Sequence, residues 1–420
     1  MNIFINKFKK ISIVTISLLI CIGPMSQAES RYSDHYSDSA IISDYKTNRI
    51  IYEKNADKKT AMASLSKLMT LLITFDSIKE HNVSKEDIVK IEAGDYNREG
   101  TNMKLVPGED VKLGHMMDAL MIISANDAAL AISRHVGGDY GHFVNLMNQK
   151  AKEIGMKDTV FYNPNGLPMK MNINNKSLVV ENHTTARDVL ELCKFIYKNY
   201  PDELTEITNK TDFVDKAKSI NEENTNPLLP LIPQVDGLKT GFTTAAGYCL
   251  TYSMPIRKDS NNDVNNRIIG VSMGAPSKEA RKMASYEALN YINKHYYSKS
   301  YKKANQSVVK TKINGMGNFE TNLVSKKDII FVKKNGEDIK QEITYYRVKL
   351  SESPQSPLAK LVLKDGRGNI IASSDLYSEI QAQSLGIFAK LELLISSWFV
   401  DDDRKAENQY LLDFPVYEVF

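Results

Sequence analysis

The chain has 420 residues, enough for two or three domains with a sizeable hydrophobic core. Hydrophobic residues make up 42% and charged residues 25% of the sequence, which excludes a collagen-like chain and wholesale disorder. The 54 basic residues nearly balance the 51 acidic ones, so little positive field remains to attract a phosphate backbone. We therefore do not expect nucleic acid as a partner.

The first 28 residues have the features of a secretory signal peptide. Three lysines fall within the first ten residues, an apolar run covers 11–22, and the small residues Ser26 and Ala28 offer a cleavage site. The run is short for a membrane span, and an uncleaved N-terminal anchor is the alternative. We expect an exported protein, in the periplasm or on the outer face of the cytoplasmic membrane.

Two cysteines follow the predicted signal peptide, and both lie in apolar patterns. Cys193 falls in a helical pattern and Cys249 in a strand pattern, so both are expected as buried small side chains. A disulfide between them is left open by the sequence. No clustered cysteine and histidine spacing occurs, and the sequence predicts no metal site.

The segment 29–297 alternates strand and helix patterns in a way that favours a single α+β domain. A strand pair is expected within 43–52, Thr185 is expected to cap a helix, and strands are expected over 235–254 and 267–273. Helices are expected from about residue 63 and over 113–123, 125–136, 140–154, 186–197 and 278–295. Strands near both ends with helices between them predict a sheet covered by helices.

Composition changes after residue 297. Residues 298–306 are polar and rich in lysine, and they are expected to form a linker. Short strand patterns then predict a small, sandwich-like all-β domain over 298–384. These patterns lie at 308–313, 329–332, 343–350, 358–363 and 370–372.

Residues 385–400 carry an amphipathic helical pattern. Its apolar side makes it a candidate membrane anchor, but its polar side is poorly basic, and a helix docked on its own protein explains the pattern equally well. No role is assigned to the tail, 401–420.

Ser64 and Lys67 lie three residues apart at the start of a predicted helix, so their side chains share one face within mutual reach. A serine becomes a nucleophile when a base takes its proton, and a neutral lysine can be that base. Burial and a second cation nearby both lower the pKa of a lysine. The same spacing occurs three more times in the chain, so it does not decide the function alone.

Two further motifs follow in order. Ser124-Ala125-Asn126 separates two helical patterns, where the hydroxyl can relay a proton and the amide can hold a peptide. Lys239-Thr240-Gly241 opens a strand and supplies a cation, an anion-binding hydroxyl and a close backbone approach. The three motifs together predict a serine acyl-transfer enzyme.

In these segments the chain resembles the D-alanyl-D-alanine carboxypeptidases, the low-molecular-weight penicillin-binding proteins. The likeness covers about 31–295. It includes Ala63–Thr70, Ser124–Ala129, Phe161–Leu167, Thr185–Asp188, Val235–Gly241 and Ala246–Tyr248. The resemblance implies the penicillin-recognising fold, followed by a small β domain and a C-terminal anchor helix.

The resemblance also implies the catalytic roles. Ser64 attacks the penultimate D-alanine carbonyl of a peptidoglycan pentapeptide, Lys67 takes its proton, and Ser124 helps to pass it to the leaving D-alanine. Water then hydrolyses the acyl-enzyme, and no cofactor is required. β-Lactams are implied as covalent inhibitors that acylate Ser64.

Six residues are implied to bind the substrate. Asn126 holds the peptide, while Thr240 and Arg281 bind its terminal carboxylate. Lys239 keeps the catalytic lysine neutral. Gly241 leaves room for the substrate beside the strand.

Phe242 is the last of the six, and its backbone N–H joins that of the nucleophile in an oxyanion hole. Phe242 also departs from the family pattern, because many relatives have histidine at this place. The backbone donor survives the replacement, whereas the pocket wall changes.

Three alternatives remain open. A D,D-endopeptidase acting on cross-links would use the same residues. A class A β-lactamase is disfavoured by the length of the chain, and because the only suitable acid–amide pair, Glu222 and Asn226, lies too close to Lys239. A catalytically weak penicillin-binding scaffold protein is the third.

Overall fold

The computed structural model describes residues 32–96, 99–173, 176–260, 264–313, 319–346, 348–349, 356–379 and 416–417. The predicted signal peptide and the predicted helix over 385–400 lie outside these residues. Within the part of the chain that the structure describes, no helix is long and apolar enough to cross a membrane.

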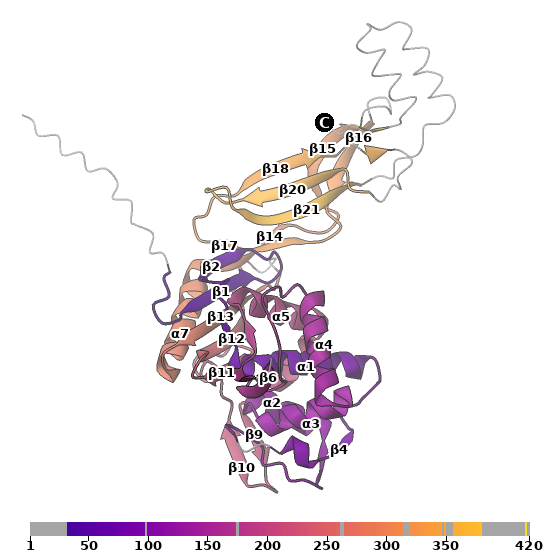
Figure 1. The fold of residues 1–420 in the computed structure, drawn as a ribbon. Coiled ribbons are helices and arrows are strands. Elements are labelled where there is room, and N and C mark those ends of the chain that lie inside the picture. Colours follow the sequence, from indigo (N-terminus) through magenta and orange to yellow (C-terminus); the bar gives the residue numbers. More distant parts are fainter. Residues whose placement is uncertain are drawn as a thin grey trace, which may run out of the picture. The chain divides into compact units, whose positions relative to one another are not determined.

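A five-stranded antiparallel sheet combines strands from near both ends of the segment 39–275 (Figure 1). Its order is β11 (Leu238–Thr243), β12 (Gly247–Pro255), β13 (Arg267–Ala275), β1 (Ser39–Asp44) and β2 (Ile50–Lys54). β1 pairs with β13, so the two ends of the predicted catalytic domain meet in the middle of the sheet. β11 is an edge strand, and one of its edges is therefore open to a ligand.

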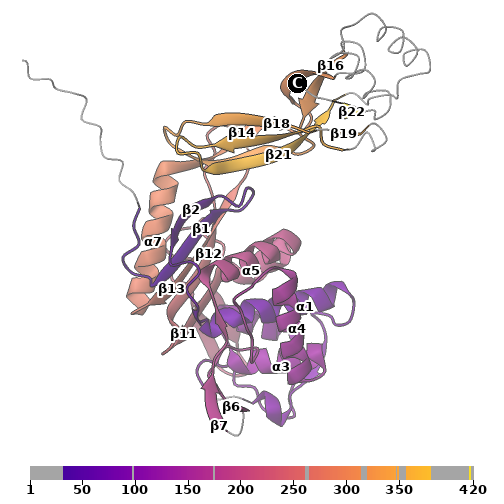
Figure 2. The same cartoon turned by 45° about the horizontal axis from the view of Figure 1, so that its top comes forward.

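Helices cover both faces of this sheet. α7 packs on one face and α5 on the other (Figures 1 and 2). The core lies between the sheet and the helices of the α5 side, and it buries the apolar residues of α1, α2, α3 and α5. The helical elements are η1 (Ala63–Ser66), α1 (Lys67–Lys79), η2 (Ala93–Asp95), α2 (Leu113–Ile122), α3 (Asn126–Gly137), α4 (Tyr140–Glu153), α5 (Ala186–Asn199), α6 (Pro201–Thr208) and α7 (Lys278–His295).

The sequence predicted most of these helices, but it missed α6 and four short strand pairs. α6 begins at a proline and has only eight residues, so it is too short to show a recognisable apolar periodicity. The pairs are β3 (Thr60–Ala61) with β8 (His183–Thr184), β4 (Ile88–Lys90) with β5 (Asp110–Lys112), β6 (Met169–Ile173) with β7 (Lys176–Val180), and β9 (Asp212–Asp215) with β10 (Ile220–Glu223).

The C-terminal β-rich part of the chain begins at Tyr296, directly after α7. The expectation of a linker over 298–306 is wrong, because β14 (Tyr296–Lys302) starts directly after α7 and pairs with β17 (Ile329–Lys334). Tyr296 and Ser298 are buried, while the other residues of the strand, including Lys299 and Lys302, stay partly exposed, so the strand looks like a polar linker in sequence.

The remaining strands confirm the short β patterns. A second five-stranded sheet has the order β15 (Ser307–Ile313), β16 (Phe319–Val324), β21 (Ile370–Ser378), β20 (Ala359–Lys364) and β18 (Lys340–Tyr345). It has its own apolar core. β19 (Val348–Lys349) pairs with β22 (Val416–Tyr417), which belongs to the otherwise undescribed tail.

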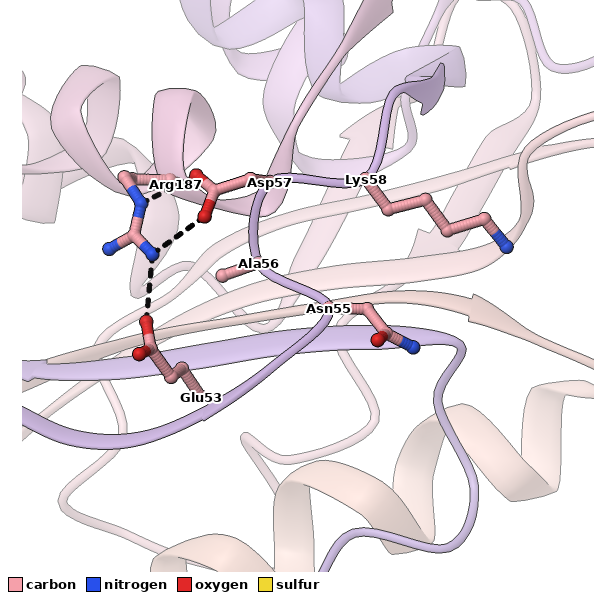
Figure 3. Close-up of a pocket in the computed structure, with 6 residues that line it drawn as sticks. All are labelled: Glu53, Asn55, Ala56, Asp57, Lys58 and Arg187. Atoms are coloured by element: carbon pink, nitrogen blue, oxygen red, sulfur yellow. Dashed lines mark hydrogen bonds and ion pairs between the residues drawn. The ribbon is translucent and has the colours of Figure 1, made fainter.

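The start of α5 shows how a local sequence motif secures the fold. Thr185 Oγ1 accepts a hydrogen bond from the backbone N–H of Asp188 at 3.1 Å, which is the predicted helix cap. Arg187 then pairs with Glu53 on β2 and with Asp57 in the segment that follows, and so ties the helix to both (Figure 3). α5 is thereby held against the sheet.

Replacing Thr185 by alanine should lower the free energy of unfolding by about 1 kcal/mol, because the N–H of Asp188 loses its acceptor. The urea midpoint measures this change. Thr185→Ser keeps the hydroxyl and should stay near the parent value. Equal destabilisation by both substitutions would contradict the capping role.

Candidate active site

Ser64 lies in the short helix η1, immediately before Lys67 begins α1. The preceding Ala63 has φ of +48°, a conformation that is uncommon for alanine. Ser66 Oγ donates to the Ala63 carbonyl at 2.8 Å and accepts from Asn182 Nδ2 at 2.8 Å. Gly166 packs so closely that a Cβ there would lie 1.9 Å from the Ala63 oxygen. The turn that presents Ser64 is thus held from two sides.

Lys67 is fully buried, and its Nζ contacts three oxygen atoms. These are Ser64 Oγ at 2.9 Å, Asn126 Oδ1 at 2.6 Å and the Asn165 carbonyl at 3.0 Å. The amide and carbonyl oxygens can only accept, so they take two protons of the amine. A neutral amine has a lone pair left, and that lone pair faces the Ser64 hydroxyl.

The surroundings of Lys67 favour this neutral form. Burial, reinforced by the positive charge of Lys239, holds the pKa of Lys67 well below its ordinary value, while Asp127 opposes the shift. A lysine in its neutral form has a lone pair that can accept the proton of a serine hydroxyl.

Ser124 and Asn126 lie in the connection between α2 and α3. Ser124 is half-buried and has φ of +64°. Asn126 Nδ2 donates to the Glu99 carbonyl at 2.8 Å, which turns its Oδ1 toward Lys67. The structure thus brings Asn126 into direct contact with Lys67, and Ser124 precedes Asn126 by two residues.

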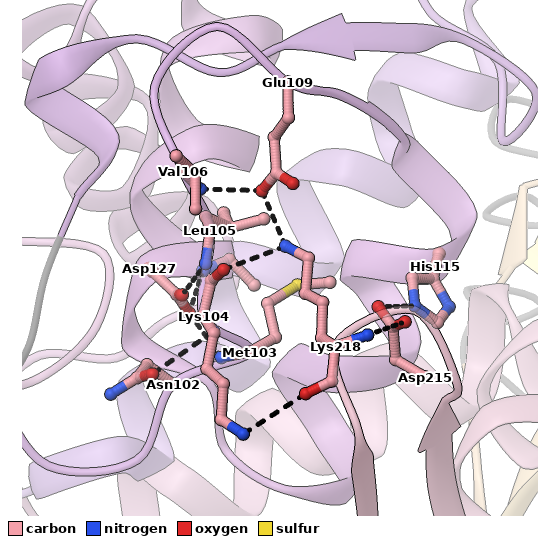
Figure 4. Close-up of polar contacts among 11 residues, drawn as sticks. Asn102, Met103, Lys104, Leu105, Val106, Glu109, His115, Asp127, Asp215 and Lys218 are labelled. Carbon is pink, nitrogen blue, oxygen red and sulfur yellow. Dashed lines mark hydrogen bonds and ion pairs between the residues drawn. The ribbon is translucent and has the colours of Figure 1, made fainter.

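Asp127 anchors the loop beside this connection (Figure 4). Its carboxylate accepts from the backbone N–H groups of Met103 and Leu105, both at 3.0 Å. Lys218, from the turn between β9 and β10, pairs with Glu109 at 2.6 Å and binds the Lys104 carbonyl. This loop also contains Glu99, whose carbonyl accepts from Asn126. It is therefore tied to α3 through Asp127 and to the turn between β9 and β10 through Lys218.

β11 runs directly past Ser64. A Cβ added to Gly241 would lie 3.2 Å from the backbone nitrogen of Ser64, so the strand and η1 are in close contact. The N–H and C=O of Lys239 both contact Thr251 Oγ1 on β12. The backbone N–H and C=O groups of successive residues point to opposite edges of a strand, and Phe242 comes three residues after Lys239. The N–H of Phe242 therefore faces the open edge of β11. It is placed to act with the N–H of Ser64 as an oxyanion hole.

Lys239 and Thr240 are both buried. Burial and the positive charge of Arg281 lower the pKa of Lys239 to about 7. Its Nζ donates to the Thr240 carbonyl at 3.1 Å. Thr240 Oγ1 is hydrogen-bonded to Thr225 Oγ1 at 2.8 Å.

Phe242 and Arg281 both lie near the ring of Tyr248. The Phe242 ring is 50% exposed and stacks on Tyr248, with centroids 4.2 Å apart. The guanidinium of the buried Arg281 lies 5.8 Å from the centroid of the Tyr248 ring. A hollow of about 360 Å³ adjoins Phe242 and Tyr248, and Asp38 and Thr60 contribute to its wall. Phe242 therefore forms an exposed aromatic wall next to the oxyanion donor.

Comparison with known proteins identifies the family. The sequence model of the D-alanyl-D-alanine carboxypeptidases matches residues 25–277. The D-alanyl-D-alanine carboxypeptidase DacF of Bacillus subtilis is 30% identical over 382 residues, which cover 87% of this chain and 90% of that protein. The chain belongs to the D-alanyl-D-alanine carboxypeptidase family.

Solved structures agree with this family. Penicillin-binding protein 5 of Haemophilus influenzae has the same fold, with a TM-score of 0.69 and 24% identity over 83% of this chain and 98% of that one. Penicillin-binding protein D2 of Listeria monocytogenes, in its cefotaxime-bound form, matches with a TM-score of 0.52 and 27% identity. That match covers 62% of this chain and 98% of that protein. The penicillin-recognising fold predicted from the sequence is confirmed.

Four contacts of this carboxypeptidase site escaped the sequence reasoning. Asn165 acts through its backbone carbonyl, and Thr225 lies in an irregular segment, so neither is marked by a side-chain pattern. Asn182 precedes a two-residue strand, and Asp127 directly follows the second motif. The adjacency of Asp127 to Asn126 is the only one of these signals that the sequence displays.

Cys193 and Cys249 are both buried free thiols, which resolves the question of a disulfide. Burial raises the pKa of each thiol, so neither is a reactive nucleophile. In the described segments, no group of three or more metal-ligating side chains comes together.

Removing the charge of Lys239 should shift the pH–rate profile of acylation to higher pH. Acylation requires neutral Lys67, so its rate rises as pH passes the pKa of Lys67. In Lys239→Gln the cation that disfavours protonated Lys67 is gone, so this pKa rises and the ascending limb shifts to higher pH. The rate of labelling by a fluorescent penicillin, measured across pH, checks the shift. Lys239→Arg keeps the charge and should leave the limb in place; an unshifted limb in Lys239→Gln would contradict the electrostatic role.

Proposed function

We propose that this enzyme removes the terminal D-alanine from peptidoglycan stem peptides through an acyl-enzyme on Ser64. The observation that carries the proposal is the arrangement around Lys67. Two obligate acceptors occupy two N–H groups of a neutral amine and leave its lone pair directed at Ser64 Oγ. Membership of the carboxypeptidase family supports the proposal that the cleaved bond is the one to the terminal D-alanine.

In the first step, Ser64 Oγ attacks the carbonyl carbon of the penultimate D-alanine, and Lys67 takes the hydroxyl proton. Negative charge moves to the carbonyl oxygen, which the N–H groups of Ser64 and Phe242 stabilise. The peptide C–N bond then breaks, and the departing D-alanine amine receives a proton by way of Ser124.

In the second step, water attacks the acyl-enzyme. Lys67 takes a proton from the water, and Ser64 leaves as the restored hydroxyl once the ester bond breaks. The shortened peptide departs with a new carboxylate. No metal or cofactor enters this scheme.

The substrate is held on both sides of the scissile bond. The terminal carboxylate is bound by the Thr240 hydroxyl and by Arg281, whose buried guanidinium supplies positive charge. Asn126 holds the peptide on the acyl side. Gly241 lets β11 pass close to η1 and Ser64, and the extended peptide lies along the open edge of β11.

β-Lactams should acylate the same serine, as substrate mimics. The cefotaxime-bound relative supports this proposal. The predicted signal peptide supports an exported location, in the periplasm or on the outer face of the cytoplasmic membrane. Peripheral membrane contact through 385–400 stays a prediction, because those residues lie outside the described ones.

Ser64→Ala should abolish covalent penicillin labelling while the fold is retained, because the acylated atom is removed. Lys67→Arg should lower the acylation rate by about a hundredfold or more, since arginine stays protonated and cannot act as a base. Mass spectrometry of the intact protein detects the adduct, and circular dichroism checks the fold. An adduct on Ser64→Ala would overturn the assignment of the nucleophile.

The reaction itself is tested by mass spectrometry of products from purified muropeptides. Loss of one alanine from pentapeptides is expected. Loss of cross-links, with pentapeptides left intact, would replace the carboxypeptidase proposal by the endopeptidase one. No product from either substrate would favour the scaffold alternative.

A further inference from the structure

A threonine outside the known motifs contacts the third motif from the side of α2. Thr225 lies in the segment between β10 and β11, and it is half-buried. Its Oγ1 donates to the Ile122 carbonyl at 3.1 Å and is 2.8 Å from Thr240 Oγ1. Ile122 is the last residue of α2, two positions before Ser124. Thr225 thus bridges the strand that carries Thr240 and the loop that carries Ser124.

The protons of the two hydroxyl groups can be accounted for. The Ile122 carbonyl can only accept, so the single proton of Thr225 points to it and Thr225 Oγ1 is left as an acceptor. The proton of Thr240 therefore points toward Thr225. In this arrangement Thr240 has no proton to offer to a carboxylate.

A substrate carboxylate requires the opposite direction. For Thr240 to donate to it, the Thr240 proton must turn toward the ligand, and Thr240 Oγ1 can then accept from Thr225. The Ile122 carbonyl loses the hydroxyl but keeps the backbone N–H of Thr225, which donates to it at 3.0 Å. Both hydroxyls can therefore reverse together without leaving a buried polar group unpaired.

We propose that Thr225 is a positioning residue whose hydroxyl reverses on substrate binding and directs the Thr240 proton to the terminal carboxylate of the peptide. The inference rests on the proposed function and refines its carboxylate site. The resulting chain runs from Thr225 through Thr240 to an anion, and hydrogen bonds in such a chain strengthen one another. The positive charges of Lys239 and Arg281 attract the anion, whereas the hydroxyl pair sets its direction.

A purely structural role for Thr225 predicts something different. The backbone N–H of Thr225 already fastens its segment to the end of α2, and a substitution of the side chain leaves that bond intact. If the hydroxyl only fastened this segment as well, its loss would affect every substrate alike. A role in orienting Thr240 instead affects only substrates that carry a terminal carboxylate.

The test compares an N-acylated tripeptide ending in D-alanyl-D-alanine with the same tripeptide carrying a C-terminal carboxamide. Thr225→Val, which has nearly the same shape, should lower kcat/KM for the acid about fivefold to tenfold, the equivalent of one hydrogen bond, mainly through KM. The value for the carboxamide should stay the same. Thr225→Ser should restore the preference for the acid, and Thr205→Val on α6 is the control for the substitution itself.

Equal losses for both tripeptides, or no rescue by Thr225→Ser, would overturn the role of Thr225. If Thr225→Val unfolds, Thr225→Ala carries the same prediction. The failure of the proposed function is a separate result, since the parent enzyme would then release no D-alanine from the acid.

Discussion

The active site depends on the burial of one amine. Lys67 has no access to solvent, and two of its hydrogen bonds go to oxygens that can only accept. An ammonium group at this place would lack water and would face the charge of Lys239, so the neutral amine is favoured. In the proposed mechanism, this arrangement lets a lysine act as the base without a carboxylate–histidine pair.

Segments from the rest of the fold surround the Lys67 amine and exclude water from it. α1 carries Lys67 into the core, the α2–α3 connection brings Asn126, and Gly166 allows the chain near Asn165 to approach η1. β11 closes the remaining side and adds the second cation. Because these segments come from four distant parts of the sequence, the base exists only in the folded chain. Destabilising any one of them should therefore change the chemistry as well as the stability.

Much of this could be predicted from the sequence, because the order of three short motifs is specific. The helices with long apolar periodicity were also predictable, as was the cap at Thr185. β14 was mistaken for a linker because only Tyr296 and Ser298 are buried, while the rest of this strand, with its lysines, is partly exposed. Asn165 and Thr225 contribute through a carbonyl and through a hydroxyl on an irregular segment, and no periodicity marks such groups. Contacts of this kind are set by tertiary packing, so only the structure displays them.

The central claim is that Lys67 is neutral at the pH at which the enzyme works, and nuclear magnetic resonance of the lysine side chains tests it most directly. In protein labelled at the lysine Cε and Nζ atoms, the Lys67 signal is the one that disappears in Lys67→Arg. A titration midpoint well below that of the exposed lysines is predicted. A midpoint equal to theirs would show a protonated Lys67 at neutral pH and would contradict its role as the base.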